Sequence, residues 1–263
     1  MKILAAYDTD IGRTKQVNQD ALCIREAETN QGLFHMSVLC DGMGGFSCGE
    51  VASATVVRAF ADWFQESLPK YMLDFSIDTV WRDWKKLAED YSRASVEYGL
   101  RMSPVVKLGT TLTAVLITEQ FGALCIQLGD SRLYRLTDSL ERITQDQTKI
   151  AVLMRQGQLT LNEYEEEHHP ERNILSDCIG GSRVECHPDF YQIPADKLTP
   201  GTAFMLCSDG FRHEVSSDEL YTALAPENLT DEGTMKQIIR RIIDLNMERN
   251  ETDNISAILL KII

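Results

Sequence analysis

Residues 33–45 read LFHMSVLCDGMGG, an apolar run of strand length that leads into a turn sequence beginning with Asp-Gly. On its N-terminal side, residues 3–9 and 20–27 are also short and rich in aliphatic and aromatic side chains. On its C-terminal side, apolar residues recur at helical spacing across 50–68 and again across 77–100. We therefore expect three strands followed by two helices that pack as an antiparallel layer.

The rest of the chain contains further strand and helix patterns. We expect strands at 110–118, 121–128, 132–136, 189–193, 203–208 and 254–263, a polar helical insert at 147–170, and helices at 217–224 and 231–248. Runs of strands with paired helices between them favour an α+β sandwich over a doubly wound sheet. Because no linker or repeat interrupts the pattern, we predict a single domain over residues 1–263 whose terminal strands pair.

The composition limits the partners of the protein. It has 26 Lys and Arg against 40 Asp and Glu, a net charge of −14, and 43% hydrophobic residues. Without a cluster of Lys and Arg, we expect it to bind neither nucleic acid nor an anionic membrane surface. Its seven cysteines include no C-x-x-C pair, and the first residues do not form a signal peptide, so we expect a cytoplasmic protein.

Four aspartates lie at the ends of apolar strands: Asp41 follows SVLC, Asp130 follows CIQLG, Asp209 follows FMLCS, and Asp253 precedes NISAILLKII. If these ends share one edge, carboxylates ~5 Å apart at an effective dielectric of ~20 repel by roughly 3 kcal/mol per pair. Such a cluster takes up protons or binds cations. Oxygen ligands without His or Cys favour Mg²⁺ or Mn²⁺ over Zn²⁺. Ordinary Asp-Gly turns are the alternative explanation for Asp41 and Asp209.

Eight ordered segments resemble the metal-dependent protein Ser/Thr phosphatases of the PPM (PP2C) type, in their bacterial subgroup. They are TDIGRTKQVNQD (9–20), VLCDGMGG (38–45), LGTTLTAVLI (108–117), QLGDSRLYRL (127–136), ITQDQT (143–148), HPERNILSDCIGG (169–181), MLCSDG (205–210) and ETDNISAILL (251–260). The resemblance implies a central sandwich of two antiparallel sheets flanked by antiparallel helical pairs, in α-β-β-α order. It also implies an insert near residues 147–185, here called the flap, over the active-site entrance.

The same resemblance implies a centre of two Mg²⁺ or Mn²⁺ ions with a weaker third site. Asp41 would bridge the two ions, and Asp130 would join Asp209 at the third. The other implied ligands are Gly42 through its backbone carbonyl, Asp209, Asp253, and Asp20, beside Gln19, through waters. Water activated between the two metals would attack phosphorus directly, without a covalent intermediate.

The phosphate-binding positions depart from the family pattern. Lys15 stands where the family has an Arg that grips phosphate, and Arg13 lies two residues earlier. On an extended segment both side chains share a face, so either could contact phosphate; we expect Lys15 to act with Asp41 and Asp209 in catalysis. Met43 stands where animal members have a His proposed as general acid, and many bacterial members share this Met.

The resemblance therefore predicts a monomeric enzyme that hydrolyses phosphoserine and phosphothreonine in proteins and opposes a bacterial Ser/Thr kinase. One alternative is a phosphatase-like module that binds phosphoproteins without turnover, because Lys15 replaces the family's Arg and Gln19 stands where the family often has an acidic residue. Another is a haloacid-dehalogenase-type phosphatase with Asp8 as nucleophile, because Asp8-Thr-Asp follows an apolar segment. Within the flap, we interpret the acidic run 163–167 as a solvated helix face.

Overall fold

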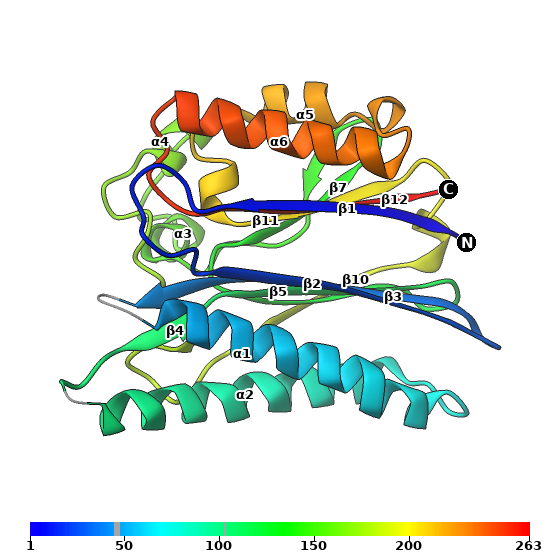
Figure 1. Cartoon of the computed structure of the whole chain (residues 1–263), viewed down its shortest axis with the longest axis horizontal. Helices are drawn as coiled ribbons and strands as arrows, with labels where there is room; N and C mark the ends of the chain where they lie inside the picture. Colours follow the sequence, from blue (N-terminus) through cyan, green and yellow to red (C-terminus); the bar gives the residue numbers. More distant parts are fainter. Residues whose placement is uncertain (45–47, 103) are drawn as a thin grey trace.

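The computed structural model describes residues 1–44, 48–102 and 104–263. Two antiparallel sheets lie face to face, and a pair of helices covers the outer face of each sheet (Figure 1). This α-β-β-α order confirms the predicted fold class.

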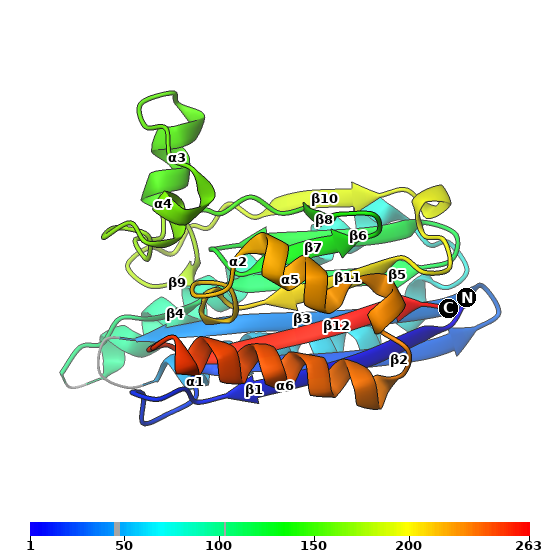
Figure 2. The ribbon, with the colours of Figure 1, turned by 90° about the horizontal axis from the view of Figure 1, so that it is seen from above.

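The first sheet has the strand order β1-β12-β11-β7-β8. Its strands are β1 (Ile3–Asp10), β12 (Ile255–Ile262), β11 (Ala203–Cys207), β7 (Arg132–Leu136) and β8 (Leu140–Arg142). Ile3 pairs with Ile262, so the two terminal strands pair as predicted. Helices α5 (Ser217–Leu224) and α6 (Glu232–Glu248) cover the outer face of this sheet (Figure 2).

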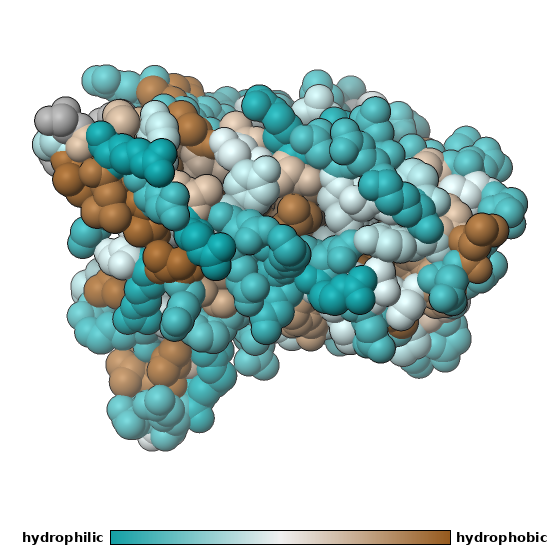
Figure 3. Space-filling view, turned by 90° about the horizontal axis from the view of Figure 1, so that it is seen from below, coloured by the Kyte–Doolittle hydropathy of each residue, from teal (hydrophilic) through white to brown (hydrophobic). Residues whose placement is uncertain are grey.

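The second sheet has the order β10-β6-β5-β3-β4-β9, with β2 also paired to β3. Its strands are β10 (Asp189–Ile193), β6 (Gly122–Leu128), β5 (Leu112–Thr118), β3 (Gly32–Gly44), β4 (Leu108–Thr110), β9 (Ile179–Gly180) and β2 (Asp20–Thr29). Helices α1 (Gly49–Asp62) and α2 (Ile77–Arg101) cover its outer face. Figure 3 shows that the surface on this side is mainly hydrophilic, with hydrophobic residues gathered toward one end.

The core follows the alternation of side chains along the strands. In β3, Met36 and Val38 point toward the helices and pack in one apolar cluster with Trp84 of α2. Leu39 points the other way and packs between the sheets in a cluster that includes Phe204 of β11. A third cluster lies between the first sheet and helices α5 and α6. Sheet edges beyond these clusters are therefore the places where polar side chains can gather.

Three local predictions were wrong at element boundaries. Strand β3 does not end in a turn at Asp-Gly, because it runs on to Gly44 and pairs Gly42 with Thr110 of β4. The helix expected over 50–68 ends at Asp62, and a π-helical turn (Trp63–Ser67) and a 3₁₀ turn (Leu68–Tyr71) follow. The short strands β4, β8 and β9 were not predicted, since none of them is long enough to show a periodic pattern.

The flap is less helical than the sequence predicts. Its helices α3 (Lys149–Arg155) and α4 (Glu163–Glu167) are separated by turn and irregular backbone, and both project beyond the sandwich at one end (Figure 2). A β-bridge between Thr148 and Leu175 closes the base of this projection. In the ranges that the structure describes, no helix has the length and apolar character needed to cross a membrane.

Candidate active site

Six of the eight predicted site residues line one cavity of about 270 Å³ at the edge of the sandwich that carries the flap, whereas Asp20 and Arg13 do not line it. The cavity is lined by Lys15, Gln19, Asp41, Gly42, Met43, Thr111, Asp130, Asn173, Leu175, Asp209 and Asp253. All four strand-end aspartates are in this set. The expected shared edge is therefore present, although the role of each residue stays a prediction.

Asp41 is positioned by the extension of β3. Its backbone N–H donates to the hydroxyl of Thr111 at 2.8 Å, and its carbonyl accepts from the backbone N–H of Thr111 at 2.8 Å. The next residue must be glycine, because a Cβ on Gly42 would collide with the carbonyl oxygens of Gln19 and Gly49. Close backbone packing on both sides therefore fixes the backbone from which the Asp41 side chain projects.

Asp20 lies directly opposite Asp41 on the neighbouring strand β2. Both carboxylate oxygens of Asp20, and Oδ1 of Asp209, are buried without a hydrogen-bond partner. Burial, together with the charge of Asp209, raises the pKa of Asp20 to about 7, and the nearby hydroxyls of Ser256 and Ser208 oppose this rise only in part. Buried oxygens that no protein group satisfies are what a hydrated cation site requires of its donors.

Asp209 and Asp253 reach the cavity from the first sheet. Asp209 begins a 3₁₀ turn after β11, and Asp253 lies just before β12. Next to it, the side-chain oxygen of Asn254 accepts a hydrogen bond from the backbone N–H of Gln19 at 2.9 Å. The side-chain nitrogen of Asn254 donates to the carbonyls of Ile11 and Val17 at 2.9 and 3.2 Å. Asn254 thus anchors the loop that carries Lys15, and this function was not predicted.

The loop at 11–19 separates Lys15 from Arg13. It is a turn-rich loop rather than the extended segment expected, so the two side chains do not share a face. Lys15 Nζ lies 2.7 Å from Asp253 Oδ1 at the cavity, whereas Arg13 donates to the carbonyl of Met247 at 2.8 Å and does not line the cavity. Of the two, only Lys15 is placed where a phosphate could meet it.

Burial and neighbouring carboxylates raise the pKa values of Asp41 and Asp130. Burial raises the pKa of Asp41 well above its usual range, and the charges of Asp20, Asp209 and Asp253 add to the shift. Burial and the charge of Asp209 raise the pKa of Asp130 to about 7. For Lys15, burial lowers the pKa but the Asp253 hydrogen bond and charge outweigh it, so the pKa is raised and the ammonium stays charged.

These donors suit Mg²⁺ or Mn²⁺ without forming a closed cage. Among the described residues, no three acidic, His or Cys side chains already converge as a preformed metal-binding cluster. Mg²⁺ usually keeps several waters and takes only one or two protein carboxylates, so carboxylates spread around an open cavity fit it. Both oxygens of Asp20 and Oδ1 of Asp209 are the best-defined candidate donors, directly or through water, because they are buried and make no hydrogen bond.

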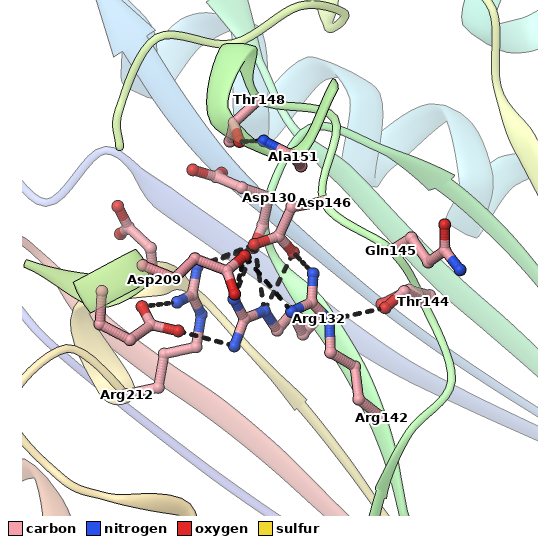
Figure 4. A network of polar contacts seen from close by, with 12 residues as sticks. Asp130, Arg132, Arg142, Thr144, Gln145, Asp146, Thr148, Ala151, Asp209 and Arg212 are labelled. Atoms are coloured by element: carbon pink, nitrogen blue, oxygen red, sulfur yellow. Dashed lines mark hydrogen bonds and ion pairs between the residues drawn. The ribbon is translucent and has the colours of Figure 1, made fainter. Parts of the chain in front are cut away.

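Buried polar groups that the sequence did not reveal lie behind Asp130 and Asp209. His213 Nε2 is 3.4 Å from Asp209 Oδ2, and its Nδ1 is 3.0 Å from Glu251. Figure 4 shows Asp130 and Asp209 beside the guanidinium groups of Arg132 and Arg212. Nothing in the local sequence pattern marks these partners, because they come from separate strands and turns.

A second cavity of about 300 Å³ continues from the first and shares Met43, Asn173 and Leu175 with it. Its other lining residues are Ser176, Asp177, Cys178, Gly180, Gly181, Ser182, Arg183 and Glu185. The two cavities together form a groove along the base of the flap. A bound molecule longer than a phosphate ester therefore has room beside the aspartates.

The alternative that uses Asp8 as a nucleophile was wrong. Asp8 lies on β1, outside the cavity, where its carboxylate is held by Arg240 of α6 at 2.7 and 2.8 Å. The antiparallel sandwich also lacks, in the described part of the chain, the parallel strand pairing of a Rossmann-like fold.

Fold and site together define an α-β-β-α protein with an acidic, cation-compatible cavity at the sheet edge. The sequence model of protein phosphatase 2C matches residues 11–259, and the chain belongs to this family of serine/threonine protein phosphatases. The resemblance seen in the ordered segments is thereby confirmed.

Relatives cover almost the whole chain. A protein phosphatase 2C-type protein of Streptococcus pyogenes is 33% identical over 266 residues, which cover 99% of this chain and 97% of the relative. The structure of the S. agalactiae serine/threonine phosphatase has a TM-score of 0.80 at 29% identity and covers 100% of both chains. The catalytic domain of the phosphatase PstP, solved with two manganese ions, has a TM-score of 0.74 at 25% identity and covers 99% of each chain.

Proposed function

We propose that this protein hydrolyses phosphoserine and phosphothreonine in proteins and that it needs Mg²⁺ or Mn²⁺ to do so. The observation that carries the proposal is the set of buried, unsatisfied oxygens of Asp20 and Asp209 beside Asp41, on the fold of the protein phosphatase 2C family. The two manganese ions in the PstP catalytic domain support the choice of cofactor.

The direct cation ligands would come from the residues that line the cavity. We assign Asp41 as the shared ligand, with the Gly42 carbonyl, Asp209 and Asp253 completing the two main sites. Asp20 would act through waters, and Asp130 with Asp209 would form a weaker third site. When bound, two divalent cations supply positive charge to the phosphate and lower the pKa of water toward neutrality.

Lys15 is the residue of this chain that we expect to orient the phosphate. Its ammonium lies in the cavity and stays charged, held at 2.7 Å from Asp253. If Asp253 served as a cation ligand, the Lys15 ammonium would be free to contact a phosphate oxygen. A lysine makes a point contact rather than the bidentate contact of an arginine, so Lys15 would hold phosphate less rigidly.

The groove supports a protein substrate rather than a small ester. It continues from the aspartates past Met43 and Leu175 to Arg183, which gives the polypeptide beside the phosphorylated residue a place to lie. We propose that side chains next to the phosphorylated residue occupy this second cavity.

We also propose a cytoplasmic location and a Ser/Thr kinase as the opposing enzyme. All seven cysteines are free, as expected in a reducing compartment. The expectation of a monomer stays a prediction, which light scattering of the purified protein can test.

The main test compares metal dependence with point variants. We expect the purified protein to release phosphate from p-nitrophenyl phosphate and from a phosphothreonine peptide with Mn²⁺, and to stop with chelator. Asp41→Asn and Asp209→Asn should each lower turnover at least about a hundredfold, while the exposed Asp138→Asn in the β7–β8 turn serves as the matched control. Metal-independent turnover that survives both substitutions would exclude the proposed chemistry.

The second candidate is a phosphoprotein-binding module without turnover. The ion pair of Lys15 with Asp253 favours it, because this ammonium competes with any cation for one carboxylate. Phosphopeptide binding by the Mn²⁺-loaded protein, with no phosphate released over hours, would support the module and reject the enzyme.

A further inference from the structure

A group of three arginines, two of them buried, lies beneath the active-site cavity and is not used by the proposed chemistry. We call it the arginine socket; it consists of Arg132 on β7, Arg142 at the end of β8, Arg212 after β11, and Asp146. The side chains of Arg132 and Arg212 are only 4% and 5% exposed. Asp146 accepts hydrogen bonds from Arg132 at 2.7 and 2.9 Å and pairs with Arg142 at 2.8 Å (Figure 4).

The socket has an excess of positive charge when the flap is left out. Three guanidinium groups face a single carboxylate, so two positive charges lack partners within the socket. Burying unpaired charge costs several kcal/mol per ion, even after relaxation. Arg132 and Arg212 are buried but Arg142 is 29% exposed, so the body of the protein presents a site that needs one anionic group in its buried part and a second at its partly exposed edge.

Helix α4 of the flap supplies two carboxylates. Glu167 Oε1 lies 2.8 Å from Arg132 Nη1, and its other oxygen contacts Arg212 Nη1. Glu166 lies 3.7 Å from Arg142 and 3.9 Å from Arg132. Burial opposes the charge of Glu167, but Arg212 and Arg132 outweigh it and hold its pKa below the usual range. The two glutamates match the excess charge of the socket.

The attachment of α4 is electrostatic rather than hydrophobic. Of the five residues in this helix, Glu167 alone is buried. The expectation of a solvated acidic face over 163–167 was therefore wrong at its last residue. A helix of five residues is too short to be stable alone, so its position depends on contacts with the body. The Glu167 contacts in the socket are the buried ones, and the hydrogen bond from Ser217 to Glu163 is an exposed one.

The socket also touches the candidate metal ligands and the cavity wall. Arg212 Nη2 donates to the backbone carbonyl of Asp130 at 3.2 Å, and the backbone N–H of Arg212 donates to the carbonyl of Asp209 at 3.0 Å. On the flap side, Asn173 and Leu175 follow α4 and line the cavity. One arginine thus contacts both the flap and the backbone of Asp130.

We propose that Glu166 and Glu167 dock the flap into the arginine socket, and that docking positions Asp130 and the cavity wall at Asn173 and Leu175. Glu167 and Arg212 are positioning residues, since they act through Asp130 and the flap. Docking itself does not depend on the proposed function; the effect on cation binding rests on Asp130 as a ligand.

The test compares two Glu→Gln variants in the flap. Glu167→Gln removes the buried charge, whereas Glu171→Gln removes an exposed one that pairs with Lys149 at 2.6 Å. Hydrogen exchange of the metal-free proteins measures docking without any need for activity. We expect backbone amides in 163–175 to exchange at least about tenfold faster in Glu167→Gln, and at the wild-type rate in Glu171→Gln.

Cation binding measures the second half of the proposal. In a calorimetric titration with Mn²⁺, the affinity of the weakest site should fall about tenfold in Glu167→Gln. The same affinity should be unchanged in Glu171→Gln. Wild-type exchange in Glu167→Gln would overturn docking. Faster exchange with unaltered Mn²⁺ affinity at every site would overturn the link to Asp130.

If the Glu167→Gln protein does not fold, a second variant, Glu166→Gln, tests docking in its place. Glu166→Gln removes the looser contacts at 3.7 and 3.9 Å. It should increase the hydrogen-exchange rate of the same amides by a smaller factor, about threefold. No acceleration in that variant would also overturn docking. Because exchange is measured without substrate, an inactive protein could still dock its flap, and an active one could fail to do so.

Discussion

Asp130→Asn should stabilise the metal-free protein while weakening its hold on divalent cations. Asp130 is 6% exposed, and burial together with Asp209 raises its pKa to about 7. Asparagine has nearly the same shape but cannot ionise. The hydrogen bond from Arg212 ends on the backbone carbonyl of Asp130, so the substitution leaves it in place.

The size of the effect follows from the two pKa values. The folded protein binds the Asp130 proton more tightly than the unfolded chain, whose pKa lies near 3.8. Below pH 3.8 Asp130 is protonated in both the folded and the unfolded state, so it does not lower the free energy of unfolding. Between pH 4 and 7 wild type loses about 1.4 kcal/mol of stability per pH unit relative to the variant, and above pH 7 the loss levels off. We expect a gain of about 2–4 kcal/mol at pH 7, or about 5–15 °C in Tm for a chain of this size.

Thermal unfolding in chelator, scanned from pH 4 to 8, measures the gain for wild type and variant side by side. The difference in Tm should be near zero at pH 4 and largest at pH 7 and above. Adding Mn²⁺ should reduce or reverse it, because the cation stabilises wild type more. An Asp130→Asn protein that is less stable than wild type in chelator at pH 7, or a gain that is equal at pH 4 and pH 7, would refute the argument.

Three further substitutions test other parts of the site. Lys15→Met should raise Mn²⁺ affinity several-fold by calorimetry, because it frees Asp253, and should raise KM for p-nitrophenyl phosphate; unchanged affinity would contradict the competition. Arg183→Glu should lower kcat/KM about tenfold for phosphopeptides with acidic neighbours and leave p-nitrophenyl phosphate unaffected, with Glu185→Gln as control; equal loss on both substrates would reject the groove. Asn254→Ala should cost about 2–4 kcal/mol in urea unfolding, since it leaves backbone groups of the Lys15 loop unpaired; a cost below about 0.5 kcal/mol would contradict its anchoring role.

The fold could be predicted because its core elements have local patterns. Strand β3 alternates between two buried faces, and α1 and α2 carry apolar residues at helical spacing. The gathering of Asp41, Asp130, Asp209 and Asp253 was predictable from their shared position at strand ends. Asp20 opposite Asp41 follows from the pairing of two predicted strands.

What could not be predicted depends on partners far away in the chain. The extension of β3 past Asp41 needs β4, which lies more than 60 residues later. Glu167 has the appearance of a solvated residue in the sequence, because the arginines that bury it come from β7 and from the turn after β11. The direction of Arg13 depends on a loop that Asn254, near the other end of the chain, holds in place.

The position of β12 decides when the active site can exist during synthesis. This strand is made after every other strand, yet it lies between β1, the first to be made, and β11. A growing chain can pair β2 to β6 early, but the first sheet stays divided until residues 255–262 leave the ribosome. Asp253 enters the site at the same moment as β12. An incomplete chain therefore has no complete acidic site, and a chain cut before β12 should release no phosphate from any phosphoprotein.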